Sequence, residues 1–186
     1  MTSHDLPPRR YAYDEIAAWP DEARRELDDG TPILLYAPGL CPIIAHSRCV
    51  SALLMALADS SQGGEPILLV DWQIDNWNSV APDLCFCSSA PTVRADGQCL
   101  IAAPDLTIEV WDERTHENDT QRKPALYARQ KVPLFWLVDA QKQSVLVHSH
   151  PTANGYSSIQ ELTQDDVLIC PMLPDFALPL TQLFDF

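Results

Sequence analysis

The stretch 104–111 constrains the fold of this 186-residue chain more than any other, because apolar and polar side chains alternate along it. Leu106, Ile108 and Val110 fall on one face of an extended chain, whereas Glu109 falls on the other. Alternation of this kind predicts a β-strand with one face packed on the core. A carboxylate inside so apolar a strand needs a partner, because burying an unpaired charge is costly. Glu109 is therefore the first candidate for chemistry.

The residues that follow this strand predict a helix and then a second strand. Residues 119–130 are expected to be helical and to start at Asp119 or Thr120, either of which can cap a helix. Residues 133–138 are almost entirely apolar, which predicts a buried strand. Residues 144–148 are expected to pair back on that strand as a hairpin.

The first half of the chain predicts two helices and several short strands. The helices are expected over 13–28, with a break at Pro20, and over 45–58. The strands are expected over 33–36, 66–72 and 82–86. The whole pattern predicts an α/β fold with a mixed β-sheet flanked by helices. The length fits a single domain, expected over 11–186 behind a flexible N-terminal arm at 1–10.

Composition narrows the class of protein. Apolar residues make up 46% of the chain, yet no run approaches the roughly 20 apolar residues that cross a bilayer. The first residues lack the apolar core of a signal peptide, so we expect a cytoplasmic protein with no membrane segment. The net charge of −14 argues against indiscriminate coating of nucleic acid, since phosphate contacts need basic residues. A local basic site stays open, because five of the twelve basic residues fall between 114 and 131.

The cysteines and two histidines predict no metal site. None of the six cysteines forms the closely spaced pairs of a zinc ribbon, so buried free thiols are expected. His148 and His150 flank Ser149, a spacing that can bind a metal on a strand. No acid or cysteine lies near them in the sequence, so a solvated hairpin end is the preferred interpretation.

A second acid and a lysine complete a set that suits phosphodiester chemistry. Asp83 opens a predicted strand, and Lys123 starts the helix that follows Glu109 by fourteen residues. Two convergent carboxylates are good ligands for a hard cation such as Mg²⁺ or Mn²⁺, which polarises a phosphodiester and acidifies a bound water. The lysine ammonium would hold the attacking water or stabilise charge on the phosphate. Phosphate contacts are expected from three nearby arginines, Arg114, Arg122 and Arg129.

Four segments, in order, resemble the signature of a known family. They are 81–84, 104–110, 123–127 and 132–139, which resemble its Pro-Asp, Glu-Val, Lys-x-x-x-Tyr and Tyr-Trp-x-x-Asp patterns. This family is the Uma-two family of restriction-endonuclease-type proteins, within the PD-(D/E)xK nuclease superfamily. Residues 26–30 are similar to its Glu-Leu-x-x-Gly pattern, and His46 matches a histidine that opens its next helix. The resemblance covers about residues 11–148.

The resemblance implies a restriction-endonuclease-like core and an endonuclease that hydrolyses DNA. It assigns metal binding to Asp83 and Glu109, makes Lys123 the catalytic lysine, and adds Glu26 as a further acid for metal or water. His46 is expected to line the site or to cap its helix. Trp111 stands two residues after Glu109, where the superfamily usually has its lysine, and is expected to narrow access to the site.

Three departures from the family pattern keep a second hypothesis open. Trp111 and Asp112 replace a common Leu-Ser, Lys131 replaces a glycine, and Leu134 replaces a glutamate. With the acidic net charge, they allow a catalytically inactive nuclease fold that acts as a binding or regulatory module.

Oligomeric state is the last expectation. Nucleases that cut both strands often pair, so a homodimer is expected. The seam would use the apolar residues of the C-terminal tail, which are Leu178, Leu180, Leu183, Phe184 and Phe186.

Overall fold

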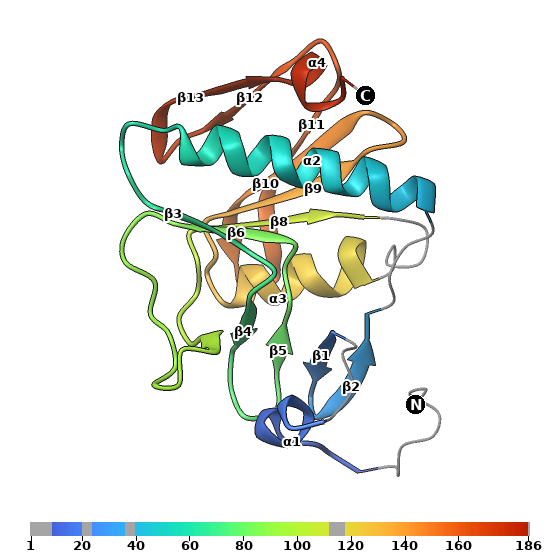
Figure 1. Ribbon diagram of the computed structural model, residues 1–186, viewed down its shortest axis with the longest axis vertical. Helices are drawn as coiled ribbons and strands as arrows, with labels where there is room; N and C mark the ends of the chain where they lie inside the picture. Colours follow the sequence, from blue (N-terminus) through green and yellow to red (C-terminus); the bar gives the residue numbers. More distant parts are fainter. Residues whose placement is uncertain (1–8, 20–23, 36–39, 112–117, 186) are drawn as a thin grey trace.

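The computed structural model describes residues 9–19, 24–35, 40–111 and 118–185, with the backbone alone for 40–42 (Figure 1). The expected arm therefore lies largely outside the described residues. Arg9 and Arg10 are described, and Arg10 lies over the ring of Trp77. None of the described helices is both long enough and apolar enough to cross a membrane.

The larger sheet has six strands in the order β11-β10-β9-β8-β6-β3. These strands are β3 (Glu65–Leu68), β6 (Leu84–Cys87), β8 (Leu106–Val110), β9 (Leu134–Asp139), β10 (Ser144–Thr152) and β11 (Gly155–Leu162). The central pair β8 and β9 is parallel, and all the other pairs are antiparallel. A parallel pair needs a crossover. Here the crossover from β8 to β9 contains one π-helical turn, η2 (Asn118–Arg122), which is followed directly by α3 (Lys123–Arg129).

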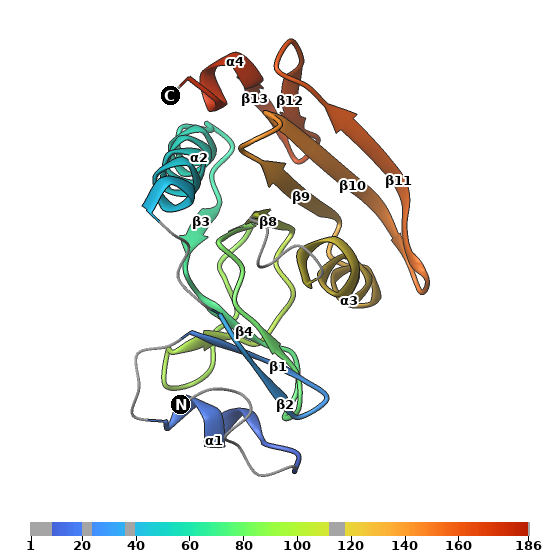
Figure 2. The same cartoon turned by 90° about the vertical axis from the view of Figure 1, so that its right-hand side faces the viewer.

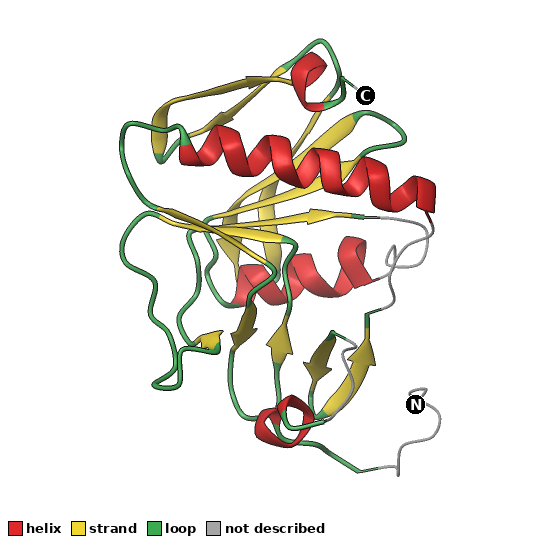
Figure 3. Ribbon diagram, in the orientation of Figure 1, coloured by secondary structure: helices red, strands yellow, loops and turns green. Residues whose placement is uncertain are grey.

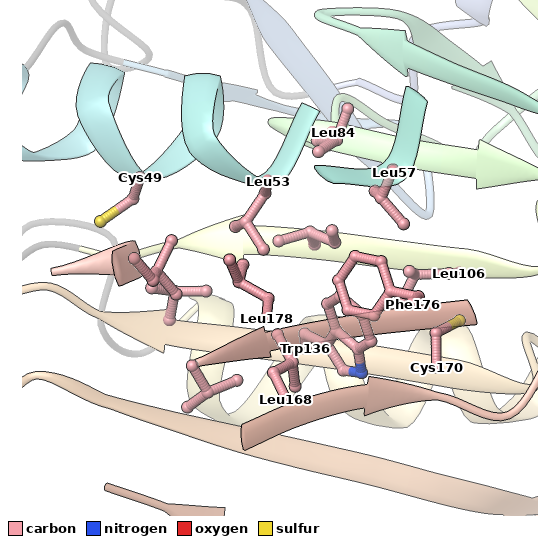
Figure 4. Close-up of a cluster of buried hydrophobic side chains, with 14 of the residues drawn as sticks. Cys49, Leu53, Leu57, Leu84, Leu106, Trp136, Leu168, Cys170, Phe176 and Leu178 are labelled. Atoms are coloured by element: carbon pink, nitrogen blue, oxygen red, sulfur yellow. The ribbon is translucent and has the colours of Figure 1, made fainter. Parts of the chain in front are cut away.

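One helix covers each face of this sheet, as Figure 2 shows. The long helix α2 (Leu40–Ala58) packs on the face formed by Leu106, Ile108 and Val110 (Figure 4). The opposite face meets α3, whose Leu126 and Tyr127 join a second apolar cluster. The alternation expected along β8 is thus confirmed, and it turns Glu109 away from the main core.

A smaller sheet lies below α3 in Figure 3 and has the order β2-β1-β5-β4-β7. Its strands are β1 (Arg25–Asp28), β2 (Thr31–Leu34), β4 (Asp71–Gln73), β5 (Ser79–Val80) and β7 (Cys99–Leu100), and α1 (Tyr13–Ala17) lies beside it. The expected strand over 66–72 is divided between the two sheets, with Leu69 at φ 51° between β3 and β4.

The helix expected over 13–28 is confirmed only for Tyr13–Ala17 and is wrong for 25–28, whereas residues 20–23 lie outside the described residues. Residues 25–28 form β1, which pairs with both β2 and β5. Asp29 and Gly30 make the tight turn to β2 with φ of 44° and 79°. Leu27 is fully buried, so tertiary pairing overrides the local helical pattern here.

The C-terminal tail belongs to the chain's own core. It forms the hairpin of β12 (Val167–Cys170) and β13 (Leu173–Pro179), followed by α4 (Leu180–Leu183). Every described residue proposed for a dimer seam is at most 8% exposed, and these are Leu178, Leu180, Leu183 and Phe184. Phe186 lies outside the described residues. The expected seam is therefore wrong, because these side chains already pack against α2 and the sheet.

The cysteine and histidine expectations have opposite outcomes. Each cysteine whose side chain is described is a buried free thiol, as expected. The solvated hairpin end at His148 is wrong, because β10 continues to Thr152 and buries this ring between Phe135 and Tyr156. His150 turns outward instead, with φ of 58°.

Candidate active site

A buried ammonium forms the centre of the candidate site. Lys123 is 3% exposed, and its Nζ lies 2.9 Å from Glu109 Oε1, 3.1 Å from Glu26 Oε1 and 3.0 Å from Asp119 Oδ1. A lysine ammonium has three N–H donors. Three carboxylate oxygens therefore lie within hydrogen-bond distance of this one ammonium.

The residues around Lys123 come from three places in the fold. Glu109 lies on β8 and faces α3, whereas Glu26 lies on β1 of the smaller sheet. Asp119 lies one helical turn before Lys123, so the two side chains share a helix face. The site thus lies where the two sheets meet. Asp119 lies inside the helical stretch, which is described from Asn118 onward, and its carboxylate forms an ion pair with Lys123.

Asp83 lies just before β6, beside the end of β8. Its Oδ2 accepts a 2.9 Å hydrogen bond from the backbone N–H of Val110 and lies 3.0 Å from His46 Nε2. The side chains of Asp83 and His46 are 17% and 26% exposed, far more than those around Lys123. Since α2 begins at Leu40, His46 lies within the helix and does not cap it. It lines the site through Asp83.

Three further residues hold the two buried glutamates. Tyr127 Oη donates a 2.7 Å hydrogen bond to Glu109 Oε1. Glu26 Oε2 accepts one from Asn118 Nδ2 at 3.1 Å and forms an ion pair with Arg122. The sequence carried a signal for them, because Tyr127 follows Lys123 by one helical turn and Arg122 follows Asn118 in the same way. We expected Tyr127 only as a core residue.

Burial and charge set the protonation of the acids. Burial raises the pKa of Glu26, but Lys123 and Arg122 outweigh it and lower that pKa below its usual value. The pKa of Asp83 is also lowered, because the hydrogen bond and charge of His46 outweigh burial. Burial and the neighbouring acids, Asp119 first, raise the pKa of Glu109 to about 8, although Lys123 opposes this. Glu109 is thus the acid of this set that gives up its proton least readily.

The pKa of Lys123 stays well above its usual value. Burial alone would lower it, but Glu109, Glu26 and Asp119 more than compensate. The raised pKa means that the ammonium is charged at neutral pH, so Lys123 is better suited to stabilise negative charge than to act as a base.

The donor chemistry of the site fits a hard divalent cation. Three carboxyl groups, of Glu26, Glu109 and Asp119, lie against Lys123 or Arg122, and Asp83 is near enough to act on the charge of Lys123. A divalent ion bound beside these acids would offset their mutual repulsion. Oxygen ligands are those that Mg²⁺ prefers. Among the described residues, however, no three acids, histidines or cysteines are arranged as a ready-made metal site.

The expected phosphate contacts do not assemble. Arg122 is committed to Glu26. Arg129 is exposed at the far end of α3, about 9 Å along the axis from Lys123. Arg114 lies outside the described residues. Trp111 packs on the second apolar cluster, with Lys142 Nζ 5.9 Å from its ring centroid.

Comparisons with known proteins agree with this fold. The family model Uma2, described as "Putative restriction endonuclease", matches residues 13–181. A crystal structure described as "a putative nuclease belonging to DUF820 from Anabaena variabilis" aligns with a TM-score of 0.77 and 19% identity. The alignment covers 94% of this chain and 97% of that one. At this identity the likeness shows the fold alone, which is a nuclease-like mixed α/β fold. No curated protein matches the chain significantly.

Proposed function

Because this chain belongs to the Uma2 family of restriction-endonuclease-like proteins, we propose that it is a metal-dependent endonuclease that hydrolyses DNA phosphodiester bonds. Asp83 and Glu109 would hold Mg²⁺ or Mn²⁺, with Glu26 as a further acid at the same place. Lys123 would be the catalytic lysine. The observation that carries this proposal is the 2.9 Å contact between Lys123 Nζ and Glu109 Oε1. Asp83 lies just before the neighbouring strand β6 and binds the N–H of Val110, the residue after Glu109.

The roles of the residues follow from their charges and contacts. The cation, when bound, would polarise the phosphodiester and lower the pKa of an attacking water. Lys123 keeps its proton, so its part is to stabilise negative charge that develops on the phosphate. Tyr127 fixes the orientation of the Glu109 carboxyl through Oε1. The backbone N–H of Val110 and the His46 ring fix Asp83.

Plasmid cleavage in Mg²⁺ or Mn²⁺ tests the proposal. Lys123→Ala is expected to abolish nicking, whereas Lys142→Ala, which removes a lysine that is 72% exposed, is expected to cleave like the wild type. Thermal denaturation of both variants checks that they are folded, because Lys123 is buried among acids. If Lys123→Met and Lys123→Ala are folded and cleave like the wild type, the mechanism fails.

The closure of the site favours one alternative function. Glu26, Glu109, Asp119 and Lys123 are each at most 3% exposed, so substrate reaches them only if the site opens. A catalytically inactive nuclease fold that acts as a binding or regulatory module would keep such a closed cluster. Calorimetric titration with Mg²⁺ separates the two functions. Binding that is lost in Asp83→Asn and Glu109→Gln supports the nuclease, and no binding to the wild type supports the inactive module.

A further inference from the structure

A nucleic-acid substrate presents phosphates along its whole backbone, and the two cations at the centre of the site are already paired with acids. Lys123 is surrounded by three carboxylates, and Arg122 is bound to Glu26 and Asn118. The surplus of acids would also repel a phosphate backbone. Substrate binding at this site therefore needs another positive group near the reacting carboxylates.

Arg24 is placed to be that group. It directly precedes β1, two residues from Glu26, and its backbone C=O accepts a 2.9 Å hydrogen bond from the N–H of Leu35. Its guanidinium NH2 lies 3.5 Å from the backbone oxygen of Pro82, one residue from Asp83. The segment 81–83 thus touches both halves of the site, since the N–H of Ala81 donates to Glu26 Oε1 at 3.2 Å.

Most N–H donors of the Arg24 guanidinium have no acceptor among the described residues. A guanidinium has five N–H donors. Within the described part of the chain, the bond to Pro82 is the only hydrogen bond or ion pair of the Arg24 side chain, and its length is at the limit for a hydrogen bond. Arg24 is near enough to Asp71 to act on its charge, yet it forms no ion pair there. It is also only half-buried.

We infer that Arg24 binds a phosphate of the nucleic-acid backbone beside the reacting carboxylates, an inference that rests on the proposed function. The planar fork of the guanidinium matches two oxygens of one phosphate, a geometry that a lysine ammonium lacks. The contact to Pro82 keeps the fork next to Asp83. Arg24 is thereby the residue that brings the scissile strand to the site.

Binding measured without cleavage tests this role. Fluorescence anisotropy with a labelled DNA duplex in EDTA compares the wild type with Arg24→Ala, Arg24→Lys and Arg129→Ala. Arg129→Ala is the matched control, because it removes an identical charge from the far end of α3. Thermal denaturation is expected to be unchanged in all three variants, since the Arg24–Pro82 contact is weak.

The expected result is a loss of affinity of about tenfold or more in Arg24→Ala, since a charge-assisted contact is lost. The slope of log affinity against log salt should fall by about 0.9, the contribution of one phosphate contact. Arg24→Lys should keep that slope and recover part of the affinity, whereas Arg129→Ala should bind like the wild type.

Two results would overturn the inference, and only the second would also refute the proposed function. If Arg24→Ala binds DNA as well as Arg129→Ala does, Arg24 has no phosphate role, and the proposed nuclease function is untouched. If the wild type itself binds no DNA, either in EDTA or with a divalent cation present, both the role of Arg24 and the proposed function fail.

Discussion

The buried ring of His148 predicts a measurable loss of stability in mild acid. This ring is 6% exposed and lies between Phe135 and Tyr156, with ring centroids 5.0 and 5.6 Å away. Among the described residues, neither ring nitrogen has a hydrogen-bond partner. Burial lowers the pKa of His148 from 6.5 to about 4. A proton is thus bound more readily by the unfolded chain than by the folded one.

The sign and size of the effect follow from that gap. A folded pKa below the unfolded one contributes full stability above pH 6.5, and the contribution is lost as the pH falls toward 4. The difference between the unfolded and folded pKa of His148 corresponds to about 3 kcal/mol of folding stability once the pH is well below both values. At pH 5 the unfolded chain is almost fully protonated at this ring and the folded one is not, which gives a loss of about 2 kcal/mol.

Urea unfolding at pH 8 and pH 5 measures this loss against His148→Phe. From pH 8 to pH 5, the free energy of unfolding of the wild type is expected to fall by about 2 kcal/mol more than that of the variant. The contributions of Glu26, Asp83 and other acids cancel, because both proteins contain them. At pH 8 the variant should be at least as stable, since it buries no unpaired ring nitrogen. Equal losses in the two proteins would refute the reasoning.

Two further changes probe the site and the fold. Tyr127→Phe removes the hydroxyl that holds Glu109, and the rate of plasmid nicking is expected to fall about tenfold, the equivalent of one such hydrogen bond. An unchanged rate, with an unchanged circular dichroism spectrum, would make that hydrogen bond dispensable. Gly64→Ala should destabilise by about 2 kcal/mol, because φ is +103° and the new Cβ would lie 2.3 Å from Phe86 Cζ. Thermal unfolding measures this loss of stability against Gly63→Ala. That variant should lose less stability, because its φ is +75° but its new Cβ would have no atom within 4 Å.

The sequence predicted the part of the fold in which local pattern and tertiary packing agree. The alternation along β8 is a consequence of one face meeting α2, so the pattern itself contains the packing. The segment 25–28 shows where this fails. Its residues form a strand only because β2 and β5 lie on either side, and β5 comes from residues more than fifty positions later. A local pattern contains no information about such partners.

The same limit applies to the site. Glu109 was found because an acid within an apolar strand is conspicuous, and the structure does bring it to Lys123. Asp119 and Tyr127 lie one turn on either side of Lys123, a spacing that could have indicated them. Arg24 had no such signal, because its place near Asp83 depends on how the two sheets meet. The catalytic roles of these residues stay predictions.

The contact between Lys123 and Glu26 joins α3, which covers the larger sheet, to β1 of the smaller one. Each of these buried charges offsets part of the other, so the loss of either one alone would unbalance the buried cluster even in a protein without catalytic activity. Evolutionary decay of a homologue should therefore remove the two residues together, or replace them by an apolar pair of similar volume. A sequence that has lost one and retained the other would mark a chain whose sheets dock by different means.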